Sequence, residues 1–210
     1  DYTVGKGQGF SHALLHYNAI DDTVMINSIL DHYSRNKKSV IIEIASHLPE
    51  IFFRYGRPEE GIFMLKQLSD STTARRSYPE NPFAMVGAFE QGLMGLDIHV
   101  PERFVSTFSG FTDPAIWGVM EQIPFGKGTI GLLHQGRHTS VLKNQTGDTL
   151  YWQSFMEAGP DKWYINQVEE NYDGEISKWY GQNIISWFIA VAPGETISIS
   201  AQEARRSFTE

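Results

Sequence analysis

The feature that most constrains this chain is a change of pattern near residue 100. Before it, apolar residues recur at the three- and four-residue intervals of amphipathic helices. After Pro101, short runs of β-branched and aromatic residues alternate with Gly, Asp and Asn turns about every ten residues. The pattern predicts an α+β chain, with a helical segment over residues 1–97 and an antiparallel β-sandwich over residues 98–210.

Start and stop signals divide the helical segment. Residues that suit the start of a helix are Ser11, Asp22 and Pro58. Gly56 suits a helix end, and residues 39–55 before it predict one helix that is kinked at Pro49. The run over residues 83–96 is apolar on nearly all sides, so it predicts a helix that is buried on nearly all sides.

Several runs in the second part have the composition of strands. They cover residues 105–109, 116–123, 129–134, 138–144, 150–155, 163–169, 184–192 and 196–200. Residues 135–137 and 145–148 suit hairpin loops between neighbouring strands. All five Trp residues lie after residue 115, where they suit either a sandwich core or a surface that stacks against sugars.

Charge and composition exclude several classes of partner. The net charge is −8 and the Lys and Arg residues are scattered, whereas nucleic-acid binding needs clustered cations. No apolar run approaches the roughly 20 residues that span a bilayer. The sequence has no Cys, which removes disulfides and thiolate metal sites. We therefore expect neither a nucleic-acid partner nor a membrane span.

The beginning of the chain is also informative. It starts at Asp1 in Gly-rich text, without Met and without a signal-like segment. This predicts that the chain begins inside a larger protein, whose N-terminal part would be one of its partners.

The loop over residues 75–82 is the first candidate site. Glu80 lies just before the apolar run that starts at Phe83, and Arg75, Arg76 and Tyr78 are close to it in sequence. A carboxylate at this position suits a general acid or base for glycosidic cleavage. It suits equally well a cap that interacts with the helix dipole.

Histidines in the helical segment form a second group of candidates. His12 and His16 have the spacing of two zinc ligands on a helix, but Glu does not follow the first of them as it does in metalloproteases. This difference favours a structural role. His47 and Glu50 share a predicted helical face with Arg54 one turn later, which suits either pairing between helices or a pair that faces substrate.

The β part contains further candidates. His134 and His138 flank a predicted hairpin turn and could meet across the strands, but no Asp or Cys beside them completes a tetrahedral metal site. We predict no metal and no cofactor. Residues 144–146 (Asn-Gln-Thr) match the N-glycosylation pattern, which matters only in a secretory context.

Several stretches resemble one family. They are residues 52–60 (FFRYGRPEE), 78–80 (YPE) and 92–95 (GLMG), and in the β part His-x-Gly from 134, Thr139, Leu-x-Asn from 142, Gly147 and Leu-x-Trp from 150. Together they resemble six-hairpin glycosidase-like proteins over roughly residues 45–200. The resemblance implies the last helical hairpins of an (α/α)6 toroid followed by a C-terminal β-sandwich.

The resemblance also implies a function and a place for the loop. It implies a glycoside hydrolase acting on a polysaccharide or oligosaccharide, in a secreted or periplasmic location. In such toroids the loops that enter inner helices border the substrate cleft. Glu80 would then be catalytic, Tyr78 would stack on or hydrogen-bond to sugar, and Arg75 or Arg76 would hold a substrate carboxylate or keep Glu80 ionised.

Other readings stay open. Polysaccharide lyases share the layout of a toroid followed by a β domain, and a non-catalytic β domain that binds carbohydrate or acts as a scaffold also fits. A chain with only part of a toroid is expected to have little or no catalysis alone. A sugar-binding β domain would need some of Trp117, Trp152, Trp163 and Trp179 to be exposed.

Overall fold

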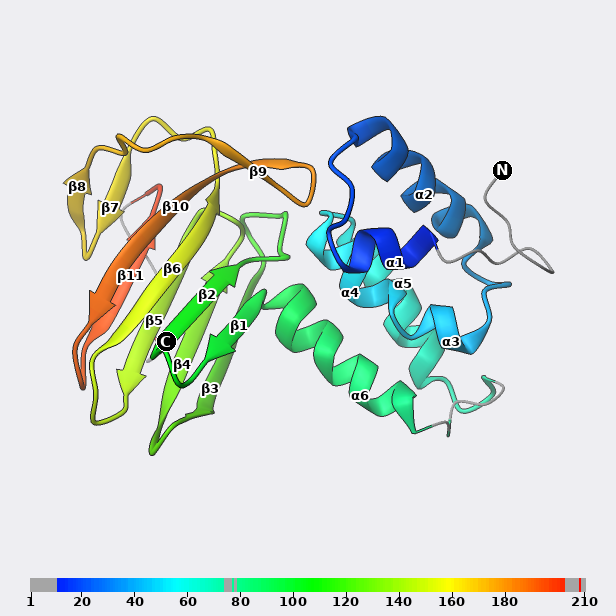
Figure 1. The fold of residues 1–210 in the computed structure, drawn as a ribbon, viewed down its shortest axis with the longest axis horizontal. Helices are drawn as coiled ribbons and strands as arrows, with labels where there is room; N and C mark the ends of the chain where they lie inside the picture. The colour runs from blue at the N-terminus through cyan, green and yellow to red at the C-terminus, as the bar shows by residue number, and fades with distance from the viewer. Residues whose placement is uncertain (1–10, 74–76, 78, 203–207, 209–210) are drawn as a thin grey trace. The chain divides into compact units, whose positions relative to one another are not determined.

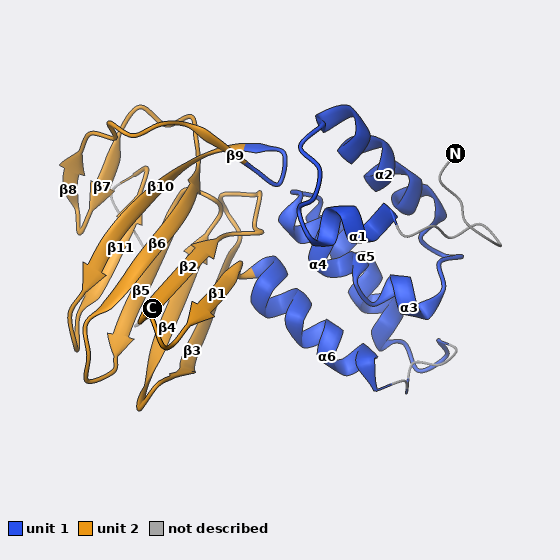
Figure 2. Ribbon diagram, in the orientation of Figure 1, with its two compact units in different colours: residues 1–93, 179–182 blue, residues 94–178, 183–210 orange. Residues whose placement is uncertain are grey.

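A computed structural model gives the structure of the chain and describes residues 11–73, 77, 79–202 and 208 (Figure 1). The chain divides into two compact units, residues 1–93 with 179–182 and residues 94–178 with 183–210 (Figure 2). The first unit is helical and the second is built from β-strands, so the fold class is mixed α+β. The expected boundary at residues 97 and 98 lies inside the strand β1 (Leu96–His99).

The helical unit is a small cluster of mostly short helices. These are α1 (Ser11–His16), α2 (Thr23–Asn36), α3 (Ile42–Ala45), α4 (Leu48–Arg54), α5 (Pro58–Ser69), α6 (Glu80–Gly87) and the π-helix η1 (Ala88–Leu93). The helix α6 runs directly into η1. Across the described residues these helices show no toroid.

Several local signals act as the sequence predicts. The Asp22 carboxylate accepts hydrogen bonds from the backbone N–H groups of Val24 and Met25, at 2.8 and 3.0 Å, and so caps α2. Gly56 ends α4 in the left-handed conformation, at φ 74°. Its N–H donates to the Phe53 carbonyl while the next N–H donates to the Phe52 carbonyl, which is a Schellman ending.

The prediction of one kinked helix over residues 39–55 is wrong. The segment forms two helices, α3 and α4, which are separated by Ser46 and His47. Pro49 lies in the first turn of α4, where its missing N–H would have no helical partner in any case. The proline therefore marks a start and not a kink.

The prediction of a buried helix over residues 83–96 is also wrong. The helical structure ends at Leu93, and Phe83, Val86 and Phe89 are 79%, 61% and 50% exposed. Asn81 and Ala88 are buried instead. A helix that is apolar on all sides is buried on all sides only where other elements surround it. The described helices pack against one side of α6 and η1.

Two sheets form the second unit. The first has the order β1 (Leu96–His99), β2 (Phe104–Phe108), β6 (Leu150–Glu157), β10 (Gln182–Val191), β9 (Ser177–Trp179). The second has the order β3 (Trp117–Phe125), β4 (Gly128–Gln135), β5 (Thr139–Gln145), β11 (Thr196–Ser200), β7 (Trp163–Ile165), β8 (Val168–Glu170). Strands β2 and β6 are parallel, and the other pairs with a defined register are antiparallel.

The core of this unit lies between the sheets. Fully buried side chains of the first sheet, such as Val105 and Trp152, belong to one cluster with Leu132 and Ile199 of the second. The predicted strands are present with small shifts at their ends, although residues 163–169 fold as the separate strands β7 and β8. The sequence did not indicate β1 or β9.

Candidate functional site

The pocket beside α6 is the strongest candidate site in the helical unit. Its volume is about 150 Å³, and it is lined by Ile42, Glu43, Ser46, His47, Glu80 and Asn81. Pockets for drug-sized ligands are commonly about 300–1,000 Å³. This pocket therefore suits one small group, such as a single sugar unit or the terminal unit of a longer ligand.

Three separate segments bring the polar side chains to this pocket. Glu43 comes from α3, His47 from the link between α3 and α4, and Glu80 is the first residue of α6. Both glutamates and His47 are exposed. Two carboxylates and an imidazole at one pocket are the groups that general acid–base chemistry uses.

The apolar side chain of Ile42 and two buried polar residues, Ser46 and Asn81, form the rest of the pocket. Asn81 is only 3% exposed, and its amide donates to the Leu68 carbonyl at 3.3 Å. The Ser46 hydroxyl donates to the Glu43 carbonyl at 3.2 Å. These bonds tie the start of α6 to the end of α5, and the end of α3 to its own preceding turn, so the backbones that carry the two glutamates are fixed locally.

Only part of the loop over residues 75–82, the first candidate site from the sequence, lies within the described residues. Glu80 is at the pocket, but Arg75, Arg76 and Tyr78 lie outside the described residues. Pro79 occupies the N-cap position of α6, and Glu80 lies in its first turn. Sequence reasoning did not single out Glu43, although its segment was expected to be helical; its spacing of four residues from His47 was the usable signal.

A buried charged cluster lies next to His47. The Glu50 carboxylate is 2.8 Å from the Arg54 guanidinium, in an i, i+4 pair within α4, and 3.7 Å from the His16 ring of α1. The His16 and His47 rings are 5.3 Å apart between centroids. Arg54 also donates to the His16 carbonyl and to the Gln91 side chain, both at 3.3 Å.

Burial governs the ionisation of this cluster. Desolvation raises the pKa of Glu50, although the charges of Arg54 and His47 act in the opposite direction. Desolvation also lowers the pKa of His16, and His47 and Arg54 lower it further. Glu50 pairs with Arg54 within α4, and the link between α4 and α1 is the hydrogen bond from Arg54 to the His16 carbonyl.

The two histidines of the β unit do not meet across the hairpin. In the register of β4 and β5, His134 is opposite Ser140. Fully buried His134 is 3.0 Å from the Met94 carbonyl through Nε2 and 2.7 Å from the Ser140 hydroxyl through Nδ1. A carbonyl can only accept, so Nε2 carries the proton and Nδ1 accepts from Ser140. His138 instead lines a second pocket of about 210 Å³.

This burial keeps His134 neutral. Desolvation lowers its pKa from 6.5 to about 4, although hydrogen bonds to the backbone of Met94 and Thr139 act in the opposite direction. Among the residues that the structure describes, no group of three or more His, Asp or Glu side chains is arranged to hold a metal ion.

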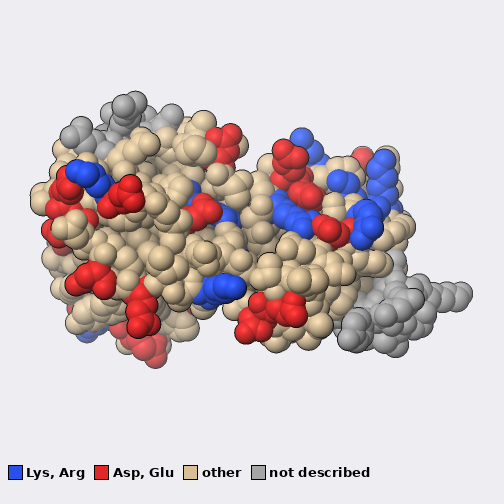
Figure 3. All heavy atoms as spheres, turned by 90° about the horizontal axis from the view of Figure 1, so that it is seen from above, with Lys and Arg blue, Asp and Glu red and all other residues tan. Residues whose placement is uncertain are grey.

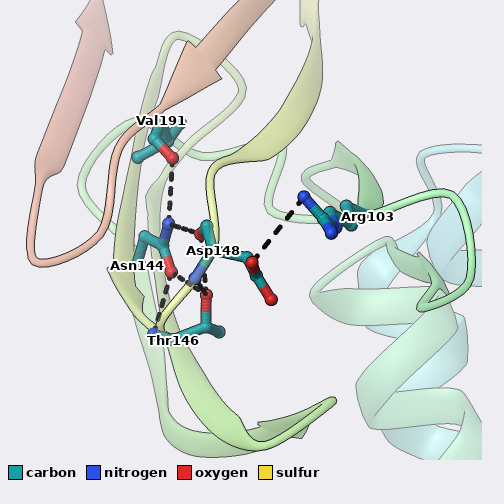
Figure 4. Close-up of polar contacts among 5 residues, drawn as sticks. All are labelled: Arg103, Asn144, Thr146, Asp148 and Val191. Atoms are coloured by element: carbon teal, nitrogen blue, oxygen red, sulfur yellow. Dashed lines mark hydrogen bonds and ion pairs between the residues drawn. The ribbon is translucent and has the colours of Figure 1, made fainter.

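Asn144 is a structural residue of the β unit (Figure 4). Its amide nitrogen donates to the carbonyls of Asp148 and Val191, both at 2.9 Å. Its oxygen accepts from the backbone N–H and the hydroxyl of Thr146, at 2.9 and 2.8 Å. The side chain is fully buried, so the Asn-Gln-Thr sequence is used to join a turn to β10.

Two of the four tryptophans considered for sugar binding are core residues. Trp152 is fully buried and donates from its indole to the Thr107 hydroxyl at 3.0 Å, and Trp163 is 2% exposed. Trp117 is 41% exposed and Trp179 is half-buried. A sugar-binding surface made from these tryptophans therefore loses two of its four members.

Charges on the face that Figure 3 shows form no basic stripe. On this face, Lys and Arg side chains alternate with Asp and Glu over both units. In the described ranges, no helix has the length and apolarity that crossing a membrane requires. No known protein family, curated protein or solved structure matches the chain.

Proposed function

We propose that this chain is part of a carbohydrate-active protein, in which the pocket of Glu43, His47 and Glu80 contributes to glycosidic bond cleavage. The observation that carries the proposal is the presence of two glutamates from different helices at one small pocket. Glycosidases of most families use a pair of carboxyl groups, one as an acid and the other as a base or nucleophile. The resemblance to six-hairpin glycosidase-like proteins supports the same reaction class.

Each group has a role in this proposal. Glu80 lies in the first turn of α6 and suits the base or nucleophile. Glu43 suits the acid that protonates the leaving oxygen. His47 lines the same pocket and suits a hydrogen-bonding partner of sugar hydroxyls.

Binding by the 210-residue chain is the first test. We expect an oligosaccharide panel to shift the imidazole ring resonances of His47 in the nuclear magnetic resonance spectrum, because that ring lines the pocket. Glu80→Gln and Glu43→Gln change the groups proposed for catalysis. They should therefore change cleavage, whether or not they also weaken this binding. Unchanged His47 resonances across the whole panel would rule out the pocket as a sugar site.

Cleavage is the second test, in the 210-residue chain and in any longer natural chain that contains it. Glu80→Gln should lower kcat by about a hundredfold or more, with an unchanged melting temperature. Glu59→Gln is the matched control, because Glu59 is also an exposed glutamate in the first turn of a helix. A lower melting temperature with near-normal kcat would assign Glu80 to helix stability. An ultraviolet-absorbing unsaturated product would indicate a lyase in place of a hydrolase.

A further inference from the structure

Three aromatic rings form an exposed cluster on the outer face of the first sheet. Phe104, Tyr151 and Phe188 come from the neighbouring strands β2, β6 and β10, which lie side by side in Figure 1. Phe104 is paired with Tyr151, and Phe188 is paired with Gln153, two residues further along β6. Alternation along a strand therefore places the three rings on one face, opposite the face that carries buried Trp152.

The three rings are close and nearly parallel. The Tyr151 and Phe188 rings have centroids 5.9 Å apart and planes at 13°. The Phe104 and Phe188 rings have centroids 6.3 Å apart and planes at 23°. Tyr151 and Phe188 are 44% and 64% exposed and Phe104 is half-buried, so two of the three rings are open to solvent.

Hydrogen-bonding side chains surround the rings on the same face. The register places His99 of β1 beside Phe104, and Asp97 beside Ser106. Exposed His99 and Asp97 are 3.2 Å apart. Gln153 lies beside Phe188. Imidazole, carboxylate, hydroxyl and amide groups therefore border an aromatic surface.

This combination matches the chemistry of a sugar chain. Sugar C–H groups carry partial positive charge and are attracted to the negative face of an aromatic ring. Sugar hydroxyls need both donors and acceptors, which the surrounding side chains supply. A purely apolar docking face would not place a carboxylate and an amide directly beside its rings.

The charges beside the cluster point to a neutral chain. Next to Phe104, Arg103 forms an ion pair with Asp148 at 3.7 Å, as Figure 4 shows. Together with Asp97, the edge of the cluster thus carries both signs and no block of cations. The two nearby carboxylates would repel a polyanion. A neutral sugar chain carries no charge, so it is not repelled.

We propose that the face around Phe104, Tyr151 and Phe188 binds a neutral polysaccharide or oligosaccharide chain. This site belongs to the β unit and goes beyond the proposed cleavage at the Glu43 and Glu80 pocket of the helical unit. It does not depend on that pocket, since binding at the sheet requires no acid or base.

The test is affinity electrophoresis of the 210-residue chain in native gels. The gels contain hydroxyethyl cellulose, glucomannan, mixed-linkage β-glucan, soluble starch or, as an anionic comparison, polygalacturonate. We expect retardation in at least one of the neutral gels. Phe188→Ala and Tyr151→Ala should weaken that binding by about tenfold or more, because exposed aromatic anchors often dominate such contacts.

Matched variants separate stacking from simple apolar contact. Ile176→Ala is the control, because Ile176 is also 64% exposed. Phe188→Trp should keep or strengthen binding, while Phe188→Leu should weaken it as much as Phe188→Ala, because leucine is apolar without a ring face. Should Tyr151→Ala fail to fold, the Phe188 series decides alone, since that side chain is the most exposed of the three.

Several results would overturn the proposal. These are no retardation in any neutral gel, retardation only by polygalacturonate, and neutral binding that Phe188→Ala or Phe188→Leu leaves unchanged. A dimer in sedimentation experiments that Phe188→Ala abolishes would assign the face to a second copy. Glu43→Gln and Glu80→Gln should keep polysaccharide binding, so failure of the pocket and failure of the sheet are distinguishable.

Discussion

The β unit buries several neutral polar side chains that have hydrogen-bond partners, together with the guanidinium of Arg137, whereas the helical unit buries a carboxylate beside a guanidinium. In the β unit, Asn144, His134 and Trp152 are fully buried, and each has a partner. In the helical unit, the side chains of Glu50 and Arg54 are only 9% and 17% exposed. Buried neutral groups with hydrogen-bond partners favour a single packing of the core. A buried ion pair makes the free energy of unfolding depend on the presence of both charged side chains.

The units differ also in their apolar surfaces. The β unit places its largest side chains between two sheets, with Trp152 at the centre of one cluster. The helical unit leaves Phe83, Val86 and Phe89 exposed along α6 and η1. Each unit therefore presents an apolar surface outside its core, which is a helix face in the helical unit and the Phe104, Tyr151 and Phe188 cluster on one sheet of the β unit.

Arg54→Met tests the charged core and should have the largest effect. It leaves the Glu50 carboxylate buried without its guanidinium, which should cost roughly 3–5 kcal/mol of unfolding free energy. Urea unfolding at pH 7 measures the loss. The double variant Glu50→Leu/Arg54→Met should recover most of it, because no charge is then buried.

The pH dependence sharpens this test. Glu50 already has a raised pKa, and removing Arg54 raises it further, so lower pH neutralises the carboxyl group in the folded variant. The loss caused by Arg54→Met should therefore be smaller at pH 5 than at pH 7. A loss below about 1 kcal/mol at pH 7 would show that the pair is not a stabilising unit.

Asn144→Ala tests the neutral core of the β unit. It removes both donors to the Asp148 and Val191 carbonyls and the acceptor of the Thr146 N–H, which should cost about 3 kcal/mol. The neighbouring Gln145→Ala is the control, because Gln145 is exposed and should change stability by less than about 0.5 kcal/mol. Equal effects in chemical unfolding would contradict the role assigned to Asn144.

The buried His134 ring should make the unfolding free energy of the β unit fall at acidic pH. Its pKa is about 4 when folded and ordinarily 6.5, so below pH 6.5 the unfolded chain takes up the proton first. Folding stability is therefore lost as pH falls from about 6.5 towards 4, by about 2 kcal/mol between pH 7 and pH 5. Unfolding free energies at both values measure this.

The control for His134 must account for other histidines. His16 and His138 also have lowered pKa values and act in the same direction. His134→Gln should leave their contribution and remove the His134 part of the pH dependence. An identical pH dependence in His134→Gln would exclude the neutral buried state of this ring.

Phe83→Ser tests the exposed helix face and should have the smallest effect. Because Phe83 is 79% exposed, the change should alter unfolding free energy by less than about 0.5 kcal/mol. Leu68→Ser, at a 1% exposed position of the same unit, is the contrasting variant and should cost several times more. A loss above about 2 kcal/mol for Phe83→Ser would mean that this face is covered.

The β unit was the more predictable part, for a physical reason. In its strands, apolar residues either alternate with polar ones or form short continuous runs, and Gly and Asn turns separate the strands. This local pattern predicts the end of each strand to within a few residues. The strand β1 was missed because Leu96 continues the apolar run over residues 83–96 that predicted a helix, and because the polar Asp97 interrupts the apolar residues of the strand itself. The division at Asn166 and Gln167 was missed because both residues adopt positive φ, at 49° and 68°, in a turn without glycine.

The candidate sites depended on contacts that the sequence does not contain. Glu80 was predicted from its place before an apolar helix, but its companion Glu43 comes from residues 39–55, where the predicted helix gave no sign of a contact with Glu80. The Phe104, Tyr151 and Phe188 cluster requires the parallel pairing of β2 with β6, which no local pattern reveals. The exposure of Phe83 depends on what packs around a helix, and composition does not encode it.

The buried amide of Asn144 has a consequence for the timing of modification. An enzyme that attaches a glycan needs the amide nitrogen free and accessible, and in the folded unit that nitrogen is committed to two carbonyls. Modification and folding at this asparagine are therefore mutually exclusive. In a secretory host, a glycan on Asn144 would mark molecules whose β unit had not closed, so glycan occupancy measured by mass spectrometry would report the misfolded fraction.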